Sequence, residues 1–283
     1  MCIRDSPWLR APFSDEGPSG SVEAIARTYL LDDYLADARD FTVGKIVHID
    51  AGAKAEAALD ETRWLQAMAD ARGYPNAIVA FAALNDPKVE ALLDAHTAFA
   101  NVRGIRHILN WHAEAAKSYT SADLLQDGAF KAGYALLAKY DLSFDLQIYP
   151  SQMLDAADLA GHHTETPVIL NHAGMPIDRD EAGLTLWRDG LVALAQRPNV
   201  AVKISGLGIV DNAWTAERIR PFVLDTIEVF GVDRCMFASD FPTDKLFGDF
   251  NATLGAFDTI TADFSDAERR KLFASNAERI YRL

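Results

Sequence analysis

Short apolar segments recur along this chain, and each is followed by a stretch in which apolar residues have helical spacing. There are seven of them, at residues 45–50, 77–84, 102–108, 143–149, 167–172, 199–205 and 234–240. Strands that alternate with helices in this way predict βα units and one parallel sheet. Seven strands are one short of the closed (β/α)8, or TIM, barrel. We therefore predict an α/β fold of the TIM-barrel type that lacks its first strand.

Helix boundaries are marked between these segments. Gly73 is placed to end one helix, and Ser265 with Glu268 forms a capping box that starts another. Pro87 suits the first turn of a helix, and Ser151 is an N-cap candidate. The predicted helices span residues 56–72, 86–100, 120–140, 151–161, 187–196, 215–230 and 265–281.

The amino-terminal residues do not continue this pattern. Residues 1–6, Met-Cys-Ile-Arg-Asp-Ser, resemble the translation of a sequencing adapter, so we expect a non-native leader there; an ordinary disordered terminus is the alternative. Residues 7–40 are expected to form an irregular loop. The missing strand would then lie before residue 1 and leave an unfilled groove in the barrel. Because no linker interrupts residues 7–283, they are predicted to form a single domain.

Charge and composition limit the classes of partner. The chain has 27 Lys and Arg against 41 Asp and Glu, a net charge of −14, which disfavours nucleic acid and anionic membrane surfaces. Cys2 and Cys235 are its two cysteines, so no disulfide framework is expected. No apolar run reaches the roughly 18 residues of a membrane span. We expect a cytoplasmic protein whose partner is a small-molecule substrate.

Two of the apolar segments stop abruptly on an ionisable residue. One is Val-Ile-Leu-Asn-His, ending at His172, and the other is Cys-Met-Phe-Ala-Ser-Asp, ending at Asp240. The carboxyl ends of the strands form the active-site face of a parallel α/β barrel. His172 and Asp240 are therefore the predicted catalytic residues.

Alternation of side chains along each strand predicts an unusually polar barrel lumen. Buried polar groups cost free energy unless they are paired, so such a lumen indicates a binding cavity. Arg106 is favoured over His107 as inward-facing, because Gly104 on the same face leaves room, and a guanidinium group suits a substrate carboxylate. The predicted substrate-binding residues are Arg106, Gln147, Tyr149, Lys203, Ser205 and His48. The alternatives are a structural ion pair for Lys203 and internal hydrogen bonds for Gln147 and His48.

Taken together, several motifs resemble those of the amidohydrolase-related, or amidohydrolase 2, family. They are Pro7-Trp-Leu9, Glu61-Thr-Arg-Trp-Leu65, Gly104-Ile-Arg-His107, Asn171-His-Ala-Gly174, Lys203-Ile-Ser-Gly206, Phe237-Ala-Ser-Asp-Phe-Pro242 and Asn276-Ala-Glu-Arg-Ile-Tyr281. The resemblance is strongest to the branch of predicted TIM-barrel hydrolases that includes sugar lactonases and 2-pyrone-4,6-dicarboxylate lactonase. It covers residues 7–283.

The resemblance implies a hydrolase with Asp240 as general base and His172 as the site histidine, acting on a small acidic or sugar lactone. The family's first-strand His-x-His pair has no counterpart in this chain. His172 and Asp240 are the remaining metal-ligand candidates, so the cofactor is either none or one divalent metal such as Zn²⁺. The alternatives are a metal-dependent decarboxylase of the same family, and a non-catalytic barrel or inactive fragment.

Overall fold

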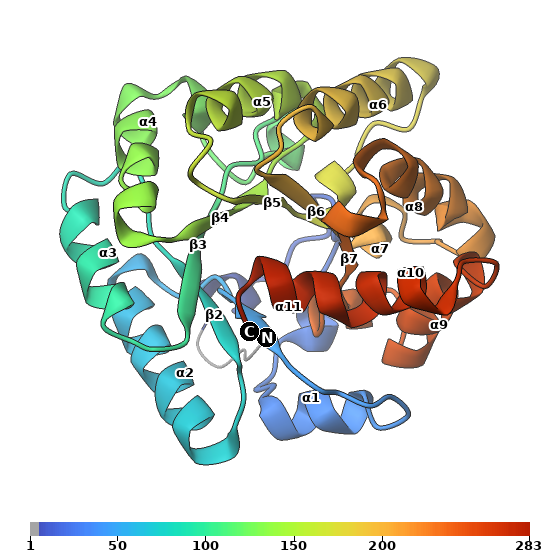
Figure 1. The fold of residues 1–283 in the computed structure, drawn as a ribbon, viewed down its shortest axis with the longest axis horizontal. Helices are drawn as coiled ribbons and strands as arrows, with labels where there is room; N and C mark the ends of the chain where they lie inside the picture. The colour runs from blue at the N-terminus through green and yellow to red at the C-terminus, as the bar shows by residue number, and fades with distance from the viewer. Residues whose placement is uncertain (1–5) are drawn as a thin grey trace.

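The computed structural model describes residues 6–283 and contains one seven-stranded parallel sheet, curled and surrounded by helices (Figure 1). Neighbouring strands follow one another in chain order, from β1 to β7. The strands are β1 (Val47–Ile49), β2 (Ala77–Phe81), β3 (Val102–Ile108), β4 (Ser143–Gln147), β5 (Val168–Leu170), β6 (Val200–Ile204) and β7 (Cys235–Phe237). Each lies within one of the seven predicted segments, so the predicted TIM-barrel type of fold is confirmed.

The outer layer consists of the helices that connect successive strands (Figure 1). They are α2 (Ala58–Arg72), α3 (Val89–Thr97), α4 (Gly128–Ala135), α5 (Met153–His162), α6 (Glu181–Ala195) and α8 (Ala216–Phe230). Shorter or peripheral helices are α1 (Leu31–Asp37), α7 (Leu207–Val210), α9 (Phe250–Ile260), α10 (Asp266–Arg270) and α11 (Asn276–Ile280). The main core lies between sheet and helices, where Phe144, Val202 and Leu191 are fully buried. None of the described helices has the length and hydropathy of a membrane span.

Local capping explains which helix boundaries the sequence predicted. Gly73 ends α2 in the left-handed conformation, with φ 77°, and the Ser265–Glu268 capping box opens α10, both as predicted. The continuous helix predicted over 120–140 is wrong, because the Asp127 side chain caps a new helix at Gly128. Ser151 is not an N-cap either, since it lies inside a 3-10 turn that precedes α5.

The lumen of the sheet is closed at one end by the carboxyl-terminal residues. Tyr281, Ala277 and Ile280 pack against lumen-facing residues of both edge strands, Val47 of β1 and Met236 of β7. Figure 1 shows α11 crossing the opening of the sheet. No described strand lies between β1 and β7, which remain the two edges of the sheet, and the carboxyl-terminal side chains pack across the lumen at this end.

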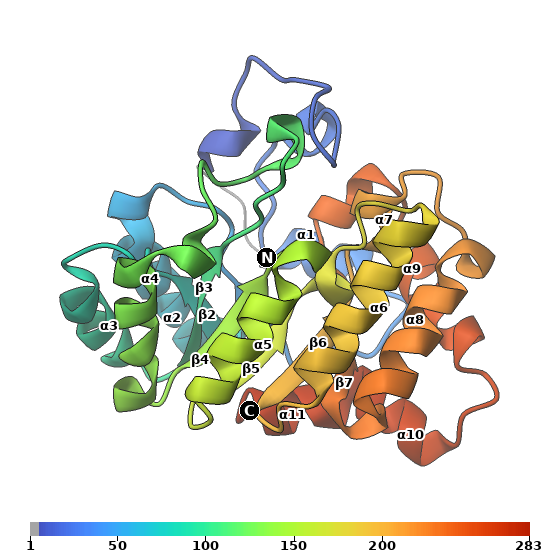
Figure 2. The same ribbon diagram turned by 90° about the horizontal axis from the view of Figure 1, so that it is seen from above.

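Residues 6–40 contain two 3-10 turns and α1 but no strand. Figure 2 shows that the first part of this segment and the loop after β3 stand together above one end of the sheet, opposite α11. The prediction of an irregular segment is confirmed, with α1 as an added helix. Both loops therefore lie where they can roof the carboxyl ends of the strands.

Candidate functional site

A cavity of about 550 Å³ lies at the carboxyl ends of the strands. Its floor and walls include Arg106, Gln147, His172 and Asp240, which come from four different strand ends. Its roof is formed by the two loops above the sheet, including Trp8, Phe13, Pro18 and Val22 of the first and Ser118 and Tyr119 of the second. The prediction that His172 and Asp240 face one cavity is confirmed. A cavity of this size accommodates a small ligand.

The backbone is strained at both predicted catalytic residues. His172 has φ 55° and Asp240 has φ 52°, in the left-handed region that few residues other than glycine adopt. Ala173, next to His172, has φ 49°. Strain of this kind costs free energy and is concentrated at functional sites. The two strand ends are thus held in conformations that local sequence preference alone does not explain.

His172 is held by the loop that follows β6. Its Nδ1 lies 3.0 Å from the Ser205 hydroxyl oxygen. Gly206, with φ 61°, passes so close to the ring that a Cβ atom there would clash with Nδ1. Burial, together with the charges of Lys203 and Arg106, lowers the His172 pKa to about 3. The imidazole is therefore neutral at physiological pH.

Asp240 is partly exposed toward the cavity, but its Oδ2 atom is buried and has no hydrogen-bond partner among the described residues. Burial raises its pKa to about 6, although the positive charges of Arg106 and Lys203 act in the opposite direction. At neutral pH the side chain is therefore an ionised carboxylate that its surroundings stabilise less than water would. A weakly solvated carboxylate with a pKa near neutrality is suited to accept a proton.

Asp244 is a second buried carboxyl group, which the sequence analysis missed. It lies one turn after Asp240, to whose carbonyl oxygen its backbone N–H donates at 3.0 Å. Burial, and then the charge of Asp240, raise the Asp244 pKa well above its usual value. Its Oδ1 atom also lacks a partner within residues 6–283. The signal in the sequence was a second aspartate four residues after the first.

Arg106 points inward as predicted, but its charge is already balanced. Its Nε donates to Asp50 Oδ2 at 2.5 Å, and its Nη2 donates to the Asp50 backbone carbonyl. The two side chains are only 8% and 3% exposed, so this is a desolvated ion pair. A longer contact of 3.4 Å joins Nη1 to Gln147 Oε1. Asp50 was not predicted as a site residue, although it ends the first apolar segment.

Lys203 and Ser205 lie beneath the cavity and do not line it. Lys203 Nζ is 2.5 Å from Asp145 Oδ1, which matches the alternative of a structural ion pair. Ser205 is buried with its hydroxyl group against His172. The prediction that both residues form the cavity wall is therefore wrong, because their side chains are already engaged by buried partners.

The predictions for His48 and Tyr149 need correction. His48 faces α2, where its Nε2 lies 3.7 Å from Glu61, because Val47 and Ile49 are the lumen-facing residues of β1. It is not a lumen residue. Tyr149 is fully buried behind the cavity, and its hydroxyl group donates to the Lys117 carbonyl at 2.7 Å. It supports the roof loop and does not reach the cavity.

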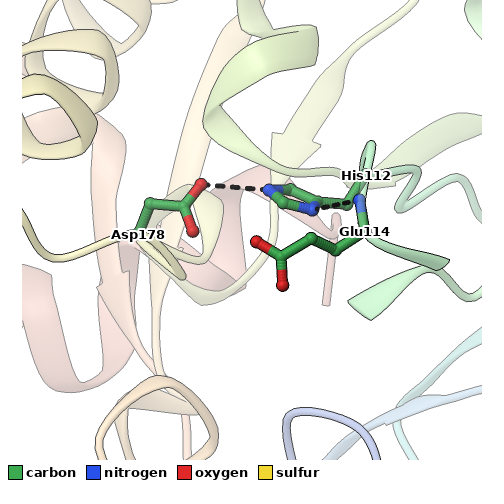
Figure 3. Close-up of side chains that lie close together, drawn as sticks. All are labelled: His112, Glu114 and Asp178. Atoms are coloured by element: carbon green, nitrogen blue, oxygen red, sulfur yellow. Dashed lines mark hydrogen bonds and ion pairs between the residues drawn. The ribbon is translucent and has the colours of Figure 1, made fainter. Parts of the chain in front are cut away.

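A cluster of potential metal ligands lies at the base of the same roof loop (Figure 3). The Glu114 backbone N–H donates to His112 Nδ1 at 3.0 Å, which leaves the ring proton on Nε2, 3.0 Å from Asp178. Lys117 Nζ lies 2.9 Å from Glu114 and 2.8 Å from Asp178. The ammonium group is thus already ion-paired with both carboxylates. We interpret the cluster as an ion-paired clasp between two loops.

We also tested whether the cavity residues suit a zinc ion. Catalytic zinc usually has three protein ligands and one open position. Within residues 6–283, the clasp is the only group of three His, Cys, Asp or Glu side chains whose ligand atoms lie within 4.8 Å of one another. His172 and Asp240 have no third partner of this kind. The described residues do not complete a zinc site in the cavity.

Comparisons with known proteins agree with this architecture. Residues 7–283 match the family model described as Amidohydrolase. Protein y4mH of Sinorhizobium fredii is 44% identical over 278 residues, covering 98% of this chain and 93% of that protein. An L-fucono-1,5-lactonase of Burkholderia multivorans is 28% identical, over 99% of this chain and 91% of that protein.

A solved structure has the same fold as this chain. The crystal structure of an amidohydrolase from Burkholderia multivorans with bound zinc superposes with a TM-score of 0.82 at 26% identity. The match covers 99% of this chain and 94% of that chain. The family model, the relatives and the shared fold all cover nearly the whole chain. This protein belongs to the amidohydrolase family.

Proposed function

We propose that this amidohydrolase hydrolyses an uncharged, sugar-sized lactone, with Asp240 as the general base. The proposal is supported by the similarity to L-fucono-1,5-lactonase at 28% identity. It rests above all on one observation: Asp240, with an unpaired carboxylate oxygen, lines the same cavity as a neutral His172.

The proposed reaction uses groups that line the cavity. Asp240 accepts a proton from water, and the resulting hydroxide adds to the lactone carbonyl carbon. The His172 Nε2–H group, with Nδ1 accepting from Ser205, stabilises the oxyanion together with the free edge of Arg106. The ring C–O bond then breaks, and protonated Asp240 returns its proton to the leaving oxygen. The product is the open-chain hydroxy acid, and no step requires a metal ion.

The charges around the cavity favour an uncharged substrate. Among the described residues, Arg106 is the only Arg or Lys that lines the cavity, and it is paired with Asp50. Besides Tyr119, whose pKa is raised by burial, the other ionisable lining residues are His172, which is neutral, and the acidic Glu16 and Asp240. A substrate carboxylate would therefore face more negative than positive charge. The aromatic side chains of Trp8 and Tyr119 in the roof suit the apolar face of a sugar ring.

A lactone panel tests this proposal. Neutral sugar 1,5-lactones and 1,4-lactones would be compared with carboxylate-bearing lactones of matched ring size, with and without a chelator. We expect kcat/KM to be at least about 100-fold higher for the neutral lactones, a difference of about 2.7 kcal/mol in transition-state stabilisation.

Two results would contradict the proposal. Preference for the carboxylate-bearing lactones would show that Arg106 is available to an anion. Turnover that a chelator abolishes and zinc restores would favour metal-dependent chemistry, including the decarboxylase alternative, and would require ligands beyond the described set.

A further inference from the structure

The carboxyl-terminal motif Asn276-Ala-Glu-Arg-Ile-Tyr281 has no role in the reaction described above. In the structure, two of its side chains attach the last helix to the sheet. The Asn276 side-chain amide donates to the carbonyl groups of Val232 and Cys235, both at 2.7 Å. Tyr281 enters the lumen and is only 2% exposed. The motif thus joins the end of the chain to the strands below the cavity.

Tyr281 contributes to a buried group of three polar side chains. Its hydroxyl group donates to Asp145 Oδ1 at 2.9 Å, the same oxygen that lies 2.5 Å from Lys203 Nζ. The Lys203 ammonium group is also 5.9 Å from the centre of the Tyr281 ring. Asp145 is completely buried, and its Oδ2 atom has no partner within residues 6–283. Tyr281 therefore provides one of the two side-chain contacts that stabilise the Asp145 carboxylate.

Lys203 connects this group to the catalytic cavity. Ser205, which contacts His172, follows Lys203 by two residues, just beyond the end of β6. Opposite Lys203 is Met236 of β7, and that strand leads to Asp240. The charge of Lys203 contributes to the electrostatic environment of both His172 and Asp240. Lys203 is thus a buried cation that is paired with one carboxylate, Asp145, and whose charge also acts on a second, Asp240.

We infer that Tyr281 is a positioning residue of the catalytic site: its hydroxyl group fixes Asp145, and Asp145 keeps the Lys203 ammonium group below the cavity and away from Asp240. Loss of the hydroxyl group weakens the site that retains Lys203. The ammonium group can then move toward the unpaired Oδ2 of Asp240. An ion pair there would occupy the lone pair that the base needs. The kinetic part of this inference rests on the proposed function.

Tyr281→Phe removes only the hydroxyl group and is the central variant. We expect kcat to fall by about tenfold while KM stays within about twofold, because the substrate does not touch Tyr281. Tyr74→Phe is the matched control, since it removes a hydroxyl group that donates to the Val43 carbonyl at 3.1 Å, away from the cavity. Its kcat should equal that of the wild type. Equal kcat in all three proteins would overturn the inference.

A double-mutant cycle tests whether Tyr281 acts through Asp145. If it does, the Tyr281→Phe/Asp145→Asn protein should have the kcat of Asp145→Asn alone, because the two changes remove the same interaction. Independent, multiplicative losses would contradict the inference.

An NMR measurement tests the positioning role without any substrate. The side-chain ammonium resonance of Lys203, assigned by its absence in Lys203→Met, should shift in Tyr281→Phe and stay unchanged in Tyr74→Phe. An unchanged resonance in Tyr281→Phe would overturn the inference even if the enzyme is an active lactonase. A wild-type protein that turns over no lactone, with the Lys203 resonance shifted in Tyr281→Phe, would refute the proposed function alone.

Discussion

At the scale of single residues, burial moves the two predicted catalytic groups toward complementary states. It raises the Asp240 pKa to about 6 and, together with nearby positive charges, lowers the His172 pKa to about 3. At pH values above about 6, Asp240 is therefore a carboxylate that can accept a proton, whereas the His172 imidazole is neutral and can donate a hydrogen bond. Environments that push two pKa values apart in this way assign the acid–base roles.

The raised Asp240 pKa predicts the acid limb of the activity profile. The base must be ionised, so kcat/KM should be constant above about pH 7 and fall tenfold per pH unit below about pH 6. His172 should add no inflection in this range, because it remains neutral. A profile measured from pH 4.5 to 8 checks this. A flat profile down to about pH 4.5 would contradict the assignment of Asp240 as the base.

Strand-end position for His172 and Asp240, and alternation of side chains for Arg106, were enough to predict that these three residues face the cavity. Their partners were not predictable in the same way. Asp50 is 56 residues from Arg106, Asp145 is 58 from Lys203, and Tyr281 is 136 from Asp145. Whether an inward-facing charge is free or paired depends on such long-range contacts. The sequence therefore located the cationic side chains but not their availability to a substrate.

At the scale of elements, the loop from β6 to α7 determines where the His172 ring lies. Gly206 starts α7 in the left-handed conformation and packs directly against that ring. The next element, α7, supplies Ile209 to the cavity wall. The loop thus fixes both the imidazole and part of the wall with which the substrate would be in contact.

Gly206→Ala should therefore damage the site more than the fold. A Cβ atom at φ 61° is strained and displaces the His172 ring, so we expect kcat/KM to fall at least about 100-fold. Gly255→Ala in α9 is the control: no atom lies within 4 Å of the added Cβ, and alanine should stabilise the helix by about 0.5–1 kcal/mol. Kinetics and urea unfolding of both variants check this. Full activity in Gly206→Ala would contradict the proposed packing.

The presence of each strand was more predictable from the sequence than the direction in which its side chains point. All seven strands lie in the predicted segments, because each apolar segment is bounded by turn residues or a helix start. The face of β1 was assigned wrongly at His48. That strand has only three residues, with Val47 and Ile49 on one face and His48 on the other, so alternation alone could not determine which face is the lumen. The helix starts at Gly128 and Glu181 follow the capping aspartates Asp127 and Asp180. Asp127 lies inside the helix predicted over 120–140, and Asp180 lies before the helix predicted over 187–196, so both starts were missed.

At the scale of the whole molecule, the sheet separates two buried polar regions. The lumen holds the ion pairs and the cavity, whereas the layer between the sheet and helices α2 to α4 contains His48, His96 and His107. Burial lowers the pKa of all three, that of His107 to about 4. These histidines are neutral in the folded protein and must gain protons when it unfolds in mild acid.

This layer predicts how stability depends on pH. A histidine with a folded pKa of about 4 and an unfolded value of 6.5 binds fewer protons when folded, so its contribution is complete above pH 6.5 and is lost as pH falls toward 4. When the pH is lowered from 7 to 5, His107 alone should reduce the free energy of unfolding by about 2 kcal/mol. Urea unfolding at both pH values should show this loss, and His107→Asn should reduce it by that amount. An equal loss in the variant would contradict the account.

The most direct test of the central claim is the turnover of Asp240→Asn measured beside its affinity for the intact lactone. Asparagine keeps the size of the side chain, tolerates φ 52°, and removes a buried charge, so the fold should be at least as stable. The account predicts that kcat falls about 1,000-fold while the lactone Kd, measured by calorimetry, stays within about twofold of the wild-type KM. A variant that retains wild-type kcat would contradict the assignment of Asp240 as the base that activates water.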